Sequence, residues 1–325
     1  MCQTQPPSRR VSSASVAESN MSVDICVGFR TDVGKKRNRN EDCLGIQFPL
    51  FAVADGMGGH QAGEVAACIA IEEMLAIADG QSFVSARQIS AAVARAAERV
   101  DALSDEPTAP GSTLTGIAFS SYRGYPVARV FNIGDSRTYL LTDDDFLQVT
   151  TDHSQIQELI DCGAVTVAEA RSLPQRNVIT RALGAGSGTD VEADQYMVPL
   201  VQGGRFLVCS DGLSGEVTDS LIEMVCRAVD DPQQAANELV NMALAAGGQD
   251  NVSVIVLDIL STTPVFDRAS GEDITQSREG KVVAERRSLD NTVHRPRSRT
   301  MAGNFDDLKN LHAGEYLAGT ELDND

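Results

Sequence analysis

Few folds accommodate the order in which this chain places its strands and helices. Short strand-like apolar runs come first, two segments with helical spacing of apolar residues follow, and a second group of strands leads to two more helices and a final strand. A doubly wound parallel sheet would instead require strands and helices to alternate. The order therefore predicts an α+β fold with a layered sheet core covered by helix pairs.

The elements are assigned from apolar periodicity and from the turn residues between them. The segment 174–189 is rich in Arg and Gly, and we interpret it as a surface flap. The predicted strands are 25–29, 51–54, 113–119, 127–133, 138–141, 146–149, 191–198, 205–210 and 252–257, and the predicted helices are 64–78, 85–103, 154–162, 167–173, 219–228 and 233–246.

Composition separates a folded region from two ends. Residues 1–22 have few apolar anchors and are expected to form a disordered extension, whereas 23–260 has the apolar content of one folded domain. Apolar periodicity fades over 261–325, which we expect to be a flexible tail. No apolar run is long enough for a membrane span, and the N-terminus does not resemble a secretory signal. The seven cysteines form no CxxC pair, which favours buried reduced thiols and a cytoplasmic location.

The charge of the chain restricts its partners. The formal net charge is −19, and most of it falls within 23–260. A domain this acidic repels nucleic acid and anionic membrane surfaces. If the domain nevertheless acts on an anion, it needs bound cations and a local arginine.

Carboxylates recur beside the predicted strands. Asp55-Gly56-Met57-Gly58-Gly59-His60 directly follows strand 51–54, while Asp42, Asp211 and Asp250 flank other extended segments. Each motif alone is also compatible with an ordinary turn. Because strand ends hold side chains rigidly, several such carboxylates could converge at one end of the sheet core.

These residues form an oxygen-only ligand set. Asp42, Asp55, Asp211 and Asp250, with the carbonyl of Gly56 and with Glu41 through water, favour Mg²⁺ or Mn²⁺ over Zn²⁺. Two such ions, about 3.5–4 Å apart, can activate a shared water for in-line displacement at phosphorus.

Two further side chains fit a phosphate reaction. The Arg37 guanidinium can grip two phosphate oxygens, and His60 could donate a proton to a leaving alkoxide. Taken alone, Arg37 fits a solvated loop charge beside Lys35 and Lys36 better than a phosphate site, and His60 is equally compatible with a residue that has no catalytic role.

Five motifs in order resemble the protein phosphatase 2C family, in its bacterial metal-dependent form. The resemblance covers residues 23–260 and is specific because all five motifs keep the family's order and spacing. The motifs are Arg37-Asn38-Arg39-Asn40-Glu41-Asp42 preceded by Thr31-Asp32-Val33-Gly34, then Val53-Ala54-Asp55-Gly56-Met57-Gly58-Gly59-His60, Gly134-Asp135-Ser136-Arg137, Ser210-Asp211-Gly212 and Asp250-Asn251.

The resemblance implies a four-layer αββα sandwich of two antiparallel sheets flanked by helix pairs, with a dinuclear metal site at one end. It implies that Asp42, Asp55, Gly56, Asp211 and Asp250 bind metal. It further implies that Asp135 and Asp211 hold a weaker third ion, that Arg37 binds phosphate and that His60 is the general acid. His153, near the flap, is expected to be structural.

The expected activity is hydrolysis of phosphoserine and phosphothreonine in proteins by a water that two metal ions activate. Phosphorylated proteins and a serine/threonine kinase are the expected partners, in bacterial signalling. The alternatives are a non-catalytic module that binds a phosphoprotein or kinase, and a hydrolase of small phosphoesters or phosphotyrosine. Ser288, Thr292, Ser298 and Thr300 lie among arginines, so the tail is either a segment that a kinase phosphorylates or docks on, or an unconstrained end.

Overall fold

The computed structural model describes residues 9–12, 21–58, 62–103, 109–170, 173, 178–186 and 191–263. All of these residues belong to one compact unit within Met1–Val283. The expected tail, except for its first three residues, lies outside the described ranges.

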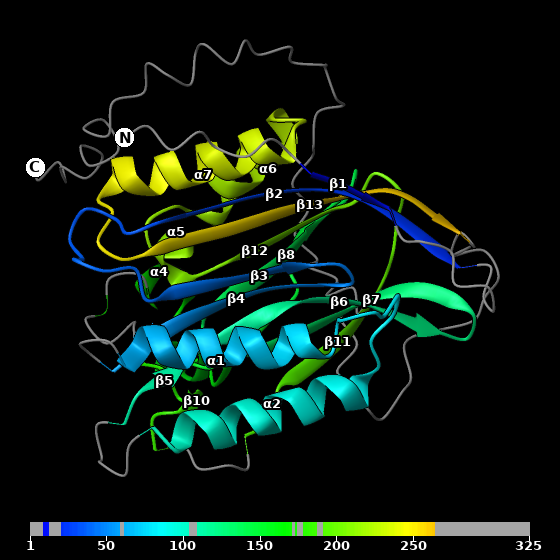
Figure 1. Ribbon diagram of the computed structural model, residues 1–325. Coiled ribbons are helices and arrows are strands. Elements are labelled where there is room, and N and C mark those ends of the chain that lie inside the picture. The colour runs from blue at the N-terminus through cyan, green and yellow to red at the C-terminus, as the bar shows by residue number, and fades with distance from the viewer. Residues whose placement is uncertain are drawn as a thin grey trace, which may run out of the picture. The chain divides into compact units, whose positions relative to one another are not determined.

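Two sheets in which every strand pairing is antiparallel form the centre of this unit (Figure 1). The six-stranded sheet has the order β1 (Arg9–Ser12), β2 (Ser22–Asp32), β13 (Val252–Thr263), β12 (Arg205–Cys209), β8 (Arg137–Leu141), β9 (Phe146–Gln148). The seven-stranded sheet has the order β10 (Leu183–Gly184), β5 (Gly111–Ser112), β4 (Leu50–Met57), β6 (Leu114–Tyr122), β7 (Tyr125–Ile133), β11 (Asp194–Pro199), and β3 (Asp42–Gln47) pairs with β4.

Strand β4 shows why its sequence is a continuous apolar run. Phe51 and Val53 pack in the core between the two sheets, together with Phe119 of β6 and Phe206 of β12. The intervening residues Leu50, Ala52 and Ala54 pack in a second core beneath the helices. Since successive side chains of a strand point to opposite faces, a strand covered on both faces needs apolar residues throughout.

A helix pair covers each sheet, which gives four layers (Figure 1). Helices α1 (Ala62–Ala76) and α2 (Ala86–Asp101) lie over the seven-stranded sheet, and α6 (Asp219–Ala228) and α7 (Pro232–Ala246) lie over the six-stranded one. Ser85 caps α2 through a reciprocal capping box with Gln88. The predicted four-layer αββα sandwich is confirmed.

Several boundaries differ from the predictions. Residues Arg9–Ser12 form β1 against β2, within the segment expected to be a disordered extension. Strand β13 continues to Thr263, because its last three residues pair with β2 beyond a register shift. Residues 183–184 form β10, where Leu183 is fully buried in the helix-side core, so this part of the expected surface flap belongs to the sheet. Short helices α3 (Gln155–Asp161) and α4 (Val167–Ala170) precede it, and α5 (Asp211–Ser214) was not predicted.

Candidate metal centre

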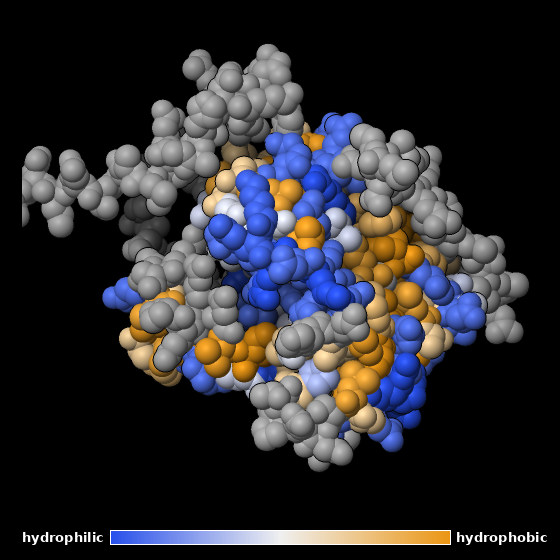
Figure 2. Space-filling view, turned by 60° about the vertical axis from the view of Figure 1, so that its left-hand side comes forward, coloured by the Kyte–Doolittle hydropathy of each residue, from blue (hydrophilic) through white to orange (hydrophobic). Residues whose placement is uncertain are grey.

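The carboxylates predicted to converge do lie at one end of the sandwich. Asp55 and Gly56 stand near the end of β4, and Asp42 begins β3 directly opposite Asp55 in the antiparallel pair. This is the left-hand end in Figure 1, where β2 leads into β3 and α7 into β13. Figure 2 turns this end towards the viewer, and hydrophilic residues gather in the middle of that face.

Asp211 and Asp250 reach the same end from the other sheet. Asp211 opens α5 directly after β12, and Asp250 lies just before β13. Ser210 joins the two sheets here, since its Oγ donates to Asp42 Oδ2 at 2.9 Å and accepts from the Ser253 N–H at 3.0 Å. The carboxylate of Asp42 is thereby held beside Asp211.

Asp135 is the least exposed of these aspartates, with 7% of the residue accessible to solvent. It follows the end of β7, and the adjacent Ser136 Oγ lies 2.8 Å from Thr113 Oγ1. Thr113 in turn accepts the Asp55 N–H through its hydroxyl and donates its own N–H to the Asp55 carbonyl. These bonds fix the backbone of the Asp55 and Asp135 turns relative to each other.

The carboxylates are close enough to perturb one another. Burial raises the pKa of Asp55 well above its ordinary range, and the charges of Asp42, Asp211, Asp135 and Asp250 raise it further. Burial also raises the pKa of Asp42 to about 7, with added repulsion from Asp211 and Asp250. The pKa values of Asp135 and Asp211 are raised as well, again mainly by burial. Such a group is stable in its ionised form only when cations compensate the charge.

Unpaired oxygens support the same conclusion. Asp42, Asp135 and Asp211 each have a buried Oδ1 without a hydrogen-bond partner among the described residues. Buried unsatisfied oxygens are costly, and hard divalent cations prefer carboxylate ligands. Within the described ranges, no group of three or more His, Cys, Asp and Glu side chains is arranged to hold an ion by itself. A main-chain carbonyl and water would therefore have to complete the coordination of any ion bound here.

Gly56 fits the role of a close-approaching main-chain ligand. A Cβ on this residue would lie 2.1 Å from the Gly63 carbonyl oxygen and 2.8 Å from that of Glu41. No side chain fits between these segments, so the start of α1 packs directly on the end of β4. Glu41 is held at the same place because the Gly56 N–H donates to its carbonyl at 3.2 Å.

Arg37 is a cation next to the carboxylates. It extends from the loop between β2 and β3, and its Nη2 donates to Asp250 Oδ2 at 2.8 Å. About half of the side chain, 54%, stays exposed. The hydrogen bond to Asp250 raises the pKa of Arg37 above its already high ordinary value. A permanently charged donor therefore stands at the open side of the cluster.

Asn251 holds this loop and was not assigned a role from the sequence. Its Oδ1 accepts the Glu41 N–H at 2.8 Å, and its Nδ2 donates to the carbonyls of Val33 and Arg39 at 2.9 and 2.8 Å. A polar residue directly after a candidate ligand and directly before a buried strand is the signal that could have identified it. Ser210 and Thr113 have similar positions at strand ends.

The structure describes one of the two histidines that the sequence analysis considered. His60 lies outside the described residues, so its predicted role stays a prediction. His153 is buried, and its Nδ1 accepts the Gly134 N–H at 3.1 Å. The imidazole thus supports the turn that carries Asp135, consistent with the structural role expected for it.

Comparison with known proteins identifies the family. Residues 32–252 match the family model described as protein phosphatase 2C. The chain is 38% identical over 260 residues to the serine/threonine protein phosphatase PstP of Mycobacterium tuberculosis (strain CDC 1551 / Oshkosh), a match that covers 75% of this chain and 48% of that protein. This chain therefore spans about half the length of that relative.

Two further matches cover nearly the whole of the compared protein. The serine/threonine phosphatase stp of Listeria innocua serovar 6a is 32% identical over 241 residues, which are 71% of this chain and 94% of that protein. The crystal structure of the catalytic domain of PstP in complex with two manganese ions is 35% identical, with a TM-score of 0.65, and the match covers 73% of this chain and 99% of the solved chain.

The matched family model extends from the end of β2 to the first residue of β13, and it includes all of the candidate ligands. The αββα sandwich is the fold of the matched crystal structures as well. The chain belongs to the protein phosphatase 2C family.

Proposed function

We propose that this protein is a metal-dependent phosphatase that hydrolyses phosphoserine and phosphothreonine in other proteins. One observation carries the proposal: buried carboxylate oxygens without partners lie beside Arg37, which is exposed. The carboxylates suit divalent cations, and the guanidinium suits a phosphate. The activities in the names of PstP and stp support the same conclusion for this chain.

We assign two ions, Mn²⁺ or Mg²⁺, to Asp42, Asp55, Asp211, Asp250 and the Gly56 carbonyl, with Glu41 acting through water. Asp135 and Asp211 would hold a weaker third ion, which fits the unpaired Oδ1 atom on each of them. When bound, these ions would neutralise negative charge at the phosphoryl group and lower the pKa of a water molecule.

The side chains of this chain bind and orient the substrate. Arg37 Nη2 would exchange its bond with Asp250 for bonds to the phosphate oxygens, while the loop held by Asn251 keeps the guanidinium in place. Because Arg37 touches the phosphate and not the seryl or threonyl part, it contributes mainly to binding. Protonation of the leaving alkoxide is assigned to His60 on the basis of the sequence motif.

The proposed partners are phosphorylated proteins, and the proposed setting is bacterial signalling in the cytoplasm, where the enzyme would reverse a serine/threonine kinase. None of the described helices is both long and apolar enough to cross a membrane.

The test is release of phosphate from a phosphothreonine peptide with Mn²⁺, with Mg²⁺ and after chelation. We expect turnover that requires metal and that disappears in Asp211→Asn. Folded, metal-loaded protein that binds the peptide without releasing phosphate would instead indicate a non-catalytic binding module. Faster turnover of p-nitrophenyl phosphate or phosphotyrosine peptides than of the phosphothreonine peptide would indicate the small-ester or phosphotyrosine alternative.

A further inference from the structure

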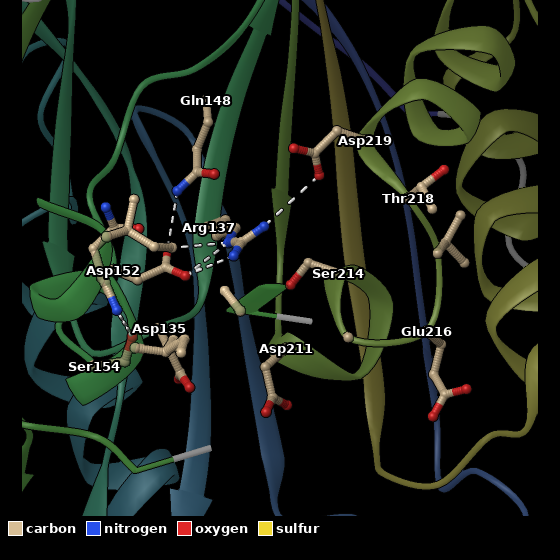
Figure 3. Close-up of a pocket in the computed structure, with 16 residues that line it drawn as sticks. Asp135, Arg137, Gln148, Asp152, Ser154, Asp211, Ser214, Glu216, Thr218 and Asp219 are labelled. Carbon is tan, nitrogen blue, oxygen red and sulfur yellow. Dashed lines mark hydrogen bonds and ion pairs between the residues drawn. The ribbon is translucent and has the colours of Figure 1, made fainter. Parts of the chain in front are cut away.

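A pocket of about 370 Å³ adjoins the candidate metal centre (Figure 3). Asp135 and Asp211 line it on the side of the carboxylate cluster, and the segment from Ser214 to Asp219 forms the opposite side. If the phosphate of a substrate polypeptide lies at the carboxylate cluster, a residue near the phosphorylated one would lie at this pocket, since consecutive residues of an extended chain are about 3.3–3.6 Å apart.

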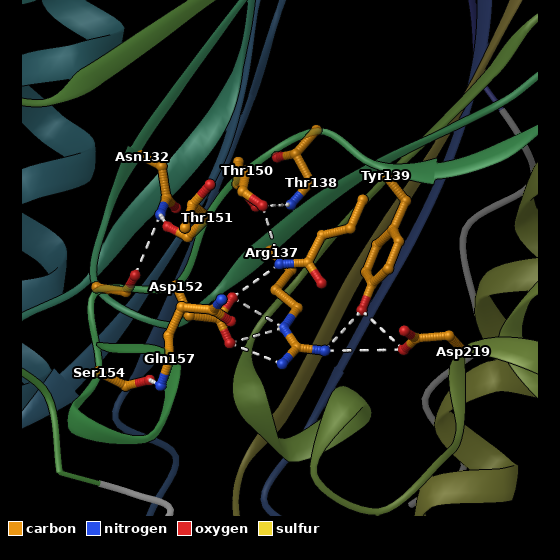
Figure 4. A network of polar contacts seen from close by, with 12 residues as sticks. Asn132, Arg137, Thr138, Tyr139, Thr150, Thr151, Asp152, Ser154, Gln157 and Asp219 are labelled. Atoms are coloured by element: carbon orange, nitrogen blue, oxygen red, sulfur yellow. Dashed lines mark hydrogen bonds and ion pairs between the residues drawn. The ribbon is translucent and has the colours of Figure 1, made fainter. Parts of the chain in front are cut away.

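The one arginine among the described residues of the pocket wall is already neutralised. Arg137 Nε donates to both carboxylate oxygens of Asp152 at 3.0 Å, and Nη2 donates to Oδ2 at 2.7 Å (Figure 4). Its remaining Nη1 donates to Tyr139 Oη at 3.1 Å and lies 3.7 Å from Asp219. With every nitrogen engaged, Arg137 is not available to a substrate anion.

The other charged groups of the wall are acidic. Glu216 lines the pocket, and although its N–H donates to the Leu213 carbonyl, its carboxylate has no hydrogen-bond or ion-pair partner in the described part of the chain. Asp219 has a side chain that is 46% exposed, and among the described residues it contacts Arg137 at 3.7 Å and accepts a hydrogen bond from Tyr139 Oη at 3.3 Å. After Arg137 and Asp152 cancel, Glu216 and Asp219 leave an excess of negative charge among the described residues on the side of the pocket away from the metal centre.

The remaining wall has an apolar part, formed by Ile156 and Ile160 of α3, Ala170 of α4, and Val217. Its other described side chains are polar and belong to Gln148, Ser154, Gln157, Ser214 and Thr218. A pocket with an apolar side and an acidic rim suits a side chain with an aliphatic stem and a cationic head, because the stem can pack on the wall while the head meets the carboxylates.

We propose that this pocket binds an arginine or lysine side chain of the phosphorylated polypeptide, and that Glu216 and Asp219 set a preference for a basic residue near the phosphorylated one. This inference rests on the proposed phosphatase function, because it places the substrate phosphate at the carboxylate cluster.

The test uses matched phosphothreonine peptides in which a single arginine moves from four residues before the phosphothreonine to four after it, within a neutral background. Dissociation constants are measured by fluorescence anisotropy with Asp250→Asn, which lacks a candidate ligand that is outside the pocket, so binding is read without turnover. The kcat/KM values of the unaltered chain are measured in parallel.

We expect at least one arginine position to improve binding and kcat/KM about fivefold or more over the neutral peptide, with the gain declining as salt rises. In the double variant Glu216→Gln, Asp219→Asn the ratio of the kcat/KM for the arginine peptide to that for the neutral peptide should fall towards one, and so should the corresponding ratio of affinities. Glu223→Gln is the matched control, because Glu223 lies on α6 outside the pocket and pairs with Arg227 at 2.8 Å. The control should keep the preference.

A preference that survives in the double variant, or no preference at any arginine position, would overturn the pocket assignment even if the enzyme is active. A preference seen in binding without phosphate release from any peptide would keep the pocket and remove the proposed activity. The two proposals therefore fail separately.

Discussion

Arg37 Nη2 donates to Oδ2 of Asp250 across 2.8 Å, and this bond joins the loop after β2 to the short segment before β13. The pair links a phosphate-binding candidate to a metal-ligand candidate. Because about half of the Arg37 side chain is exposed, the guanidinium is oriented by one partner and still accessible to another.

Arg37→Ala should raise KM for a phosphopeptide about tenfold while kcat changes less, since a charge-assisted contact to the phosphate is lost. Steady-state kinetics with a phosphothreonine peptide measures both constants. Arg39→Ala is the matched control, because Arg39 lies on the same loop and contributes its carbonyl to Asn251. An unchanged KM in Arg37→Ala would remove Arg37 from the phosphate site.

Asp211→Asn should separate metal binding from folding. In the metal-free protein the change removes a charge that burial and Asp250 disfavour, so the melting temperature in chelator should equal or exceed that of the unaltered chain. The rise in melting temperature on adding Mn²⁺ should shrink, since a ligand is lost. Differential scanning calorimetry with and without Mn²⁺ tests this, and a full Mn²⁺ response in the variant would contradict the assignment of Asp211.

The stability of the metal-free protein should fall as pH rises from about 4 to about 7. Burial raises the pKa of Asp42 from an ordinary 3.8 to about 7, so the folded state holds a proton that the unfolded chain has already released. The stabilisation that this proton gives is complete below the pKa of Asp42 in the unfolded chain and is lost as pH rises through its pKa in the folded state. For one group the free energy of unfolding falls by up to about 1.4 kcal/mol per pH unit. A hydrogen bond with His153 is the main cause that lowers the pKa of Asp194. Asp194 therefore stabilises the folded state above its ordinary pKa, and this stabilisation is lost only as pH falls into more acidic solution.

Urea unfolding in chelator across this pH range gives the measurement. Asp42→Asn should flatten the dependence, and Mn²⁺ should restore stability most at the upper end, where the carboxylates are ionised. A metal-free protein whose stability is constant from about pH 4 to pH 8 would show that the carboxylates do not interact as the structure indicates.

The sequence predicted which carboxylates converge, because each of them stands where an apolar strand meets a turn. Such strand ends can be recognised from apolar runs and turn residues in a single sequence. It did not show that Asp42 lies directly opposite Asp55, because register depends on pairing between strands. The two-residue strands β5 and β10 were missed for a related reason: only tertiary contacts identify them, and Leu183 is buried although its surroundings resemble a surface loop. Asn251 was missed because its three bonds go to backbone groups more than 200 positions away.

Asn251→Ala should therefore loosen the loop that carries Arg37. The change removes three partly buried hydrogen bonds and takes this partner from the Glu41 N–H and from the carbonyls of Val33 and Arg39, so we expect a loss of roughly 2–4 kcal/mol of unfolding free energy. Asn241→Ala is the control, because its side chain makes one exposed bond to Arg30 and should cost less than about 1 kcal/mol.

Hydrogen exchange distinguishes a local effect from a general one. Amides of residues 33–41 should exchange faster in Asn251→Ala at metal concentrations where the rest of the sheet stays protected, and kcat/KM should fall with them. The loop positions Arg37 and Glu41 together, so a looser loop impairs phosphate binding even when every candidate ligand is present. If exchange in 33–41 were unchanged while global stability dropped, Asn251 would be a folding residue without a positioning role.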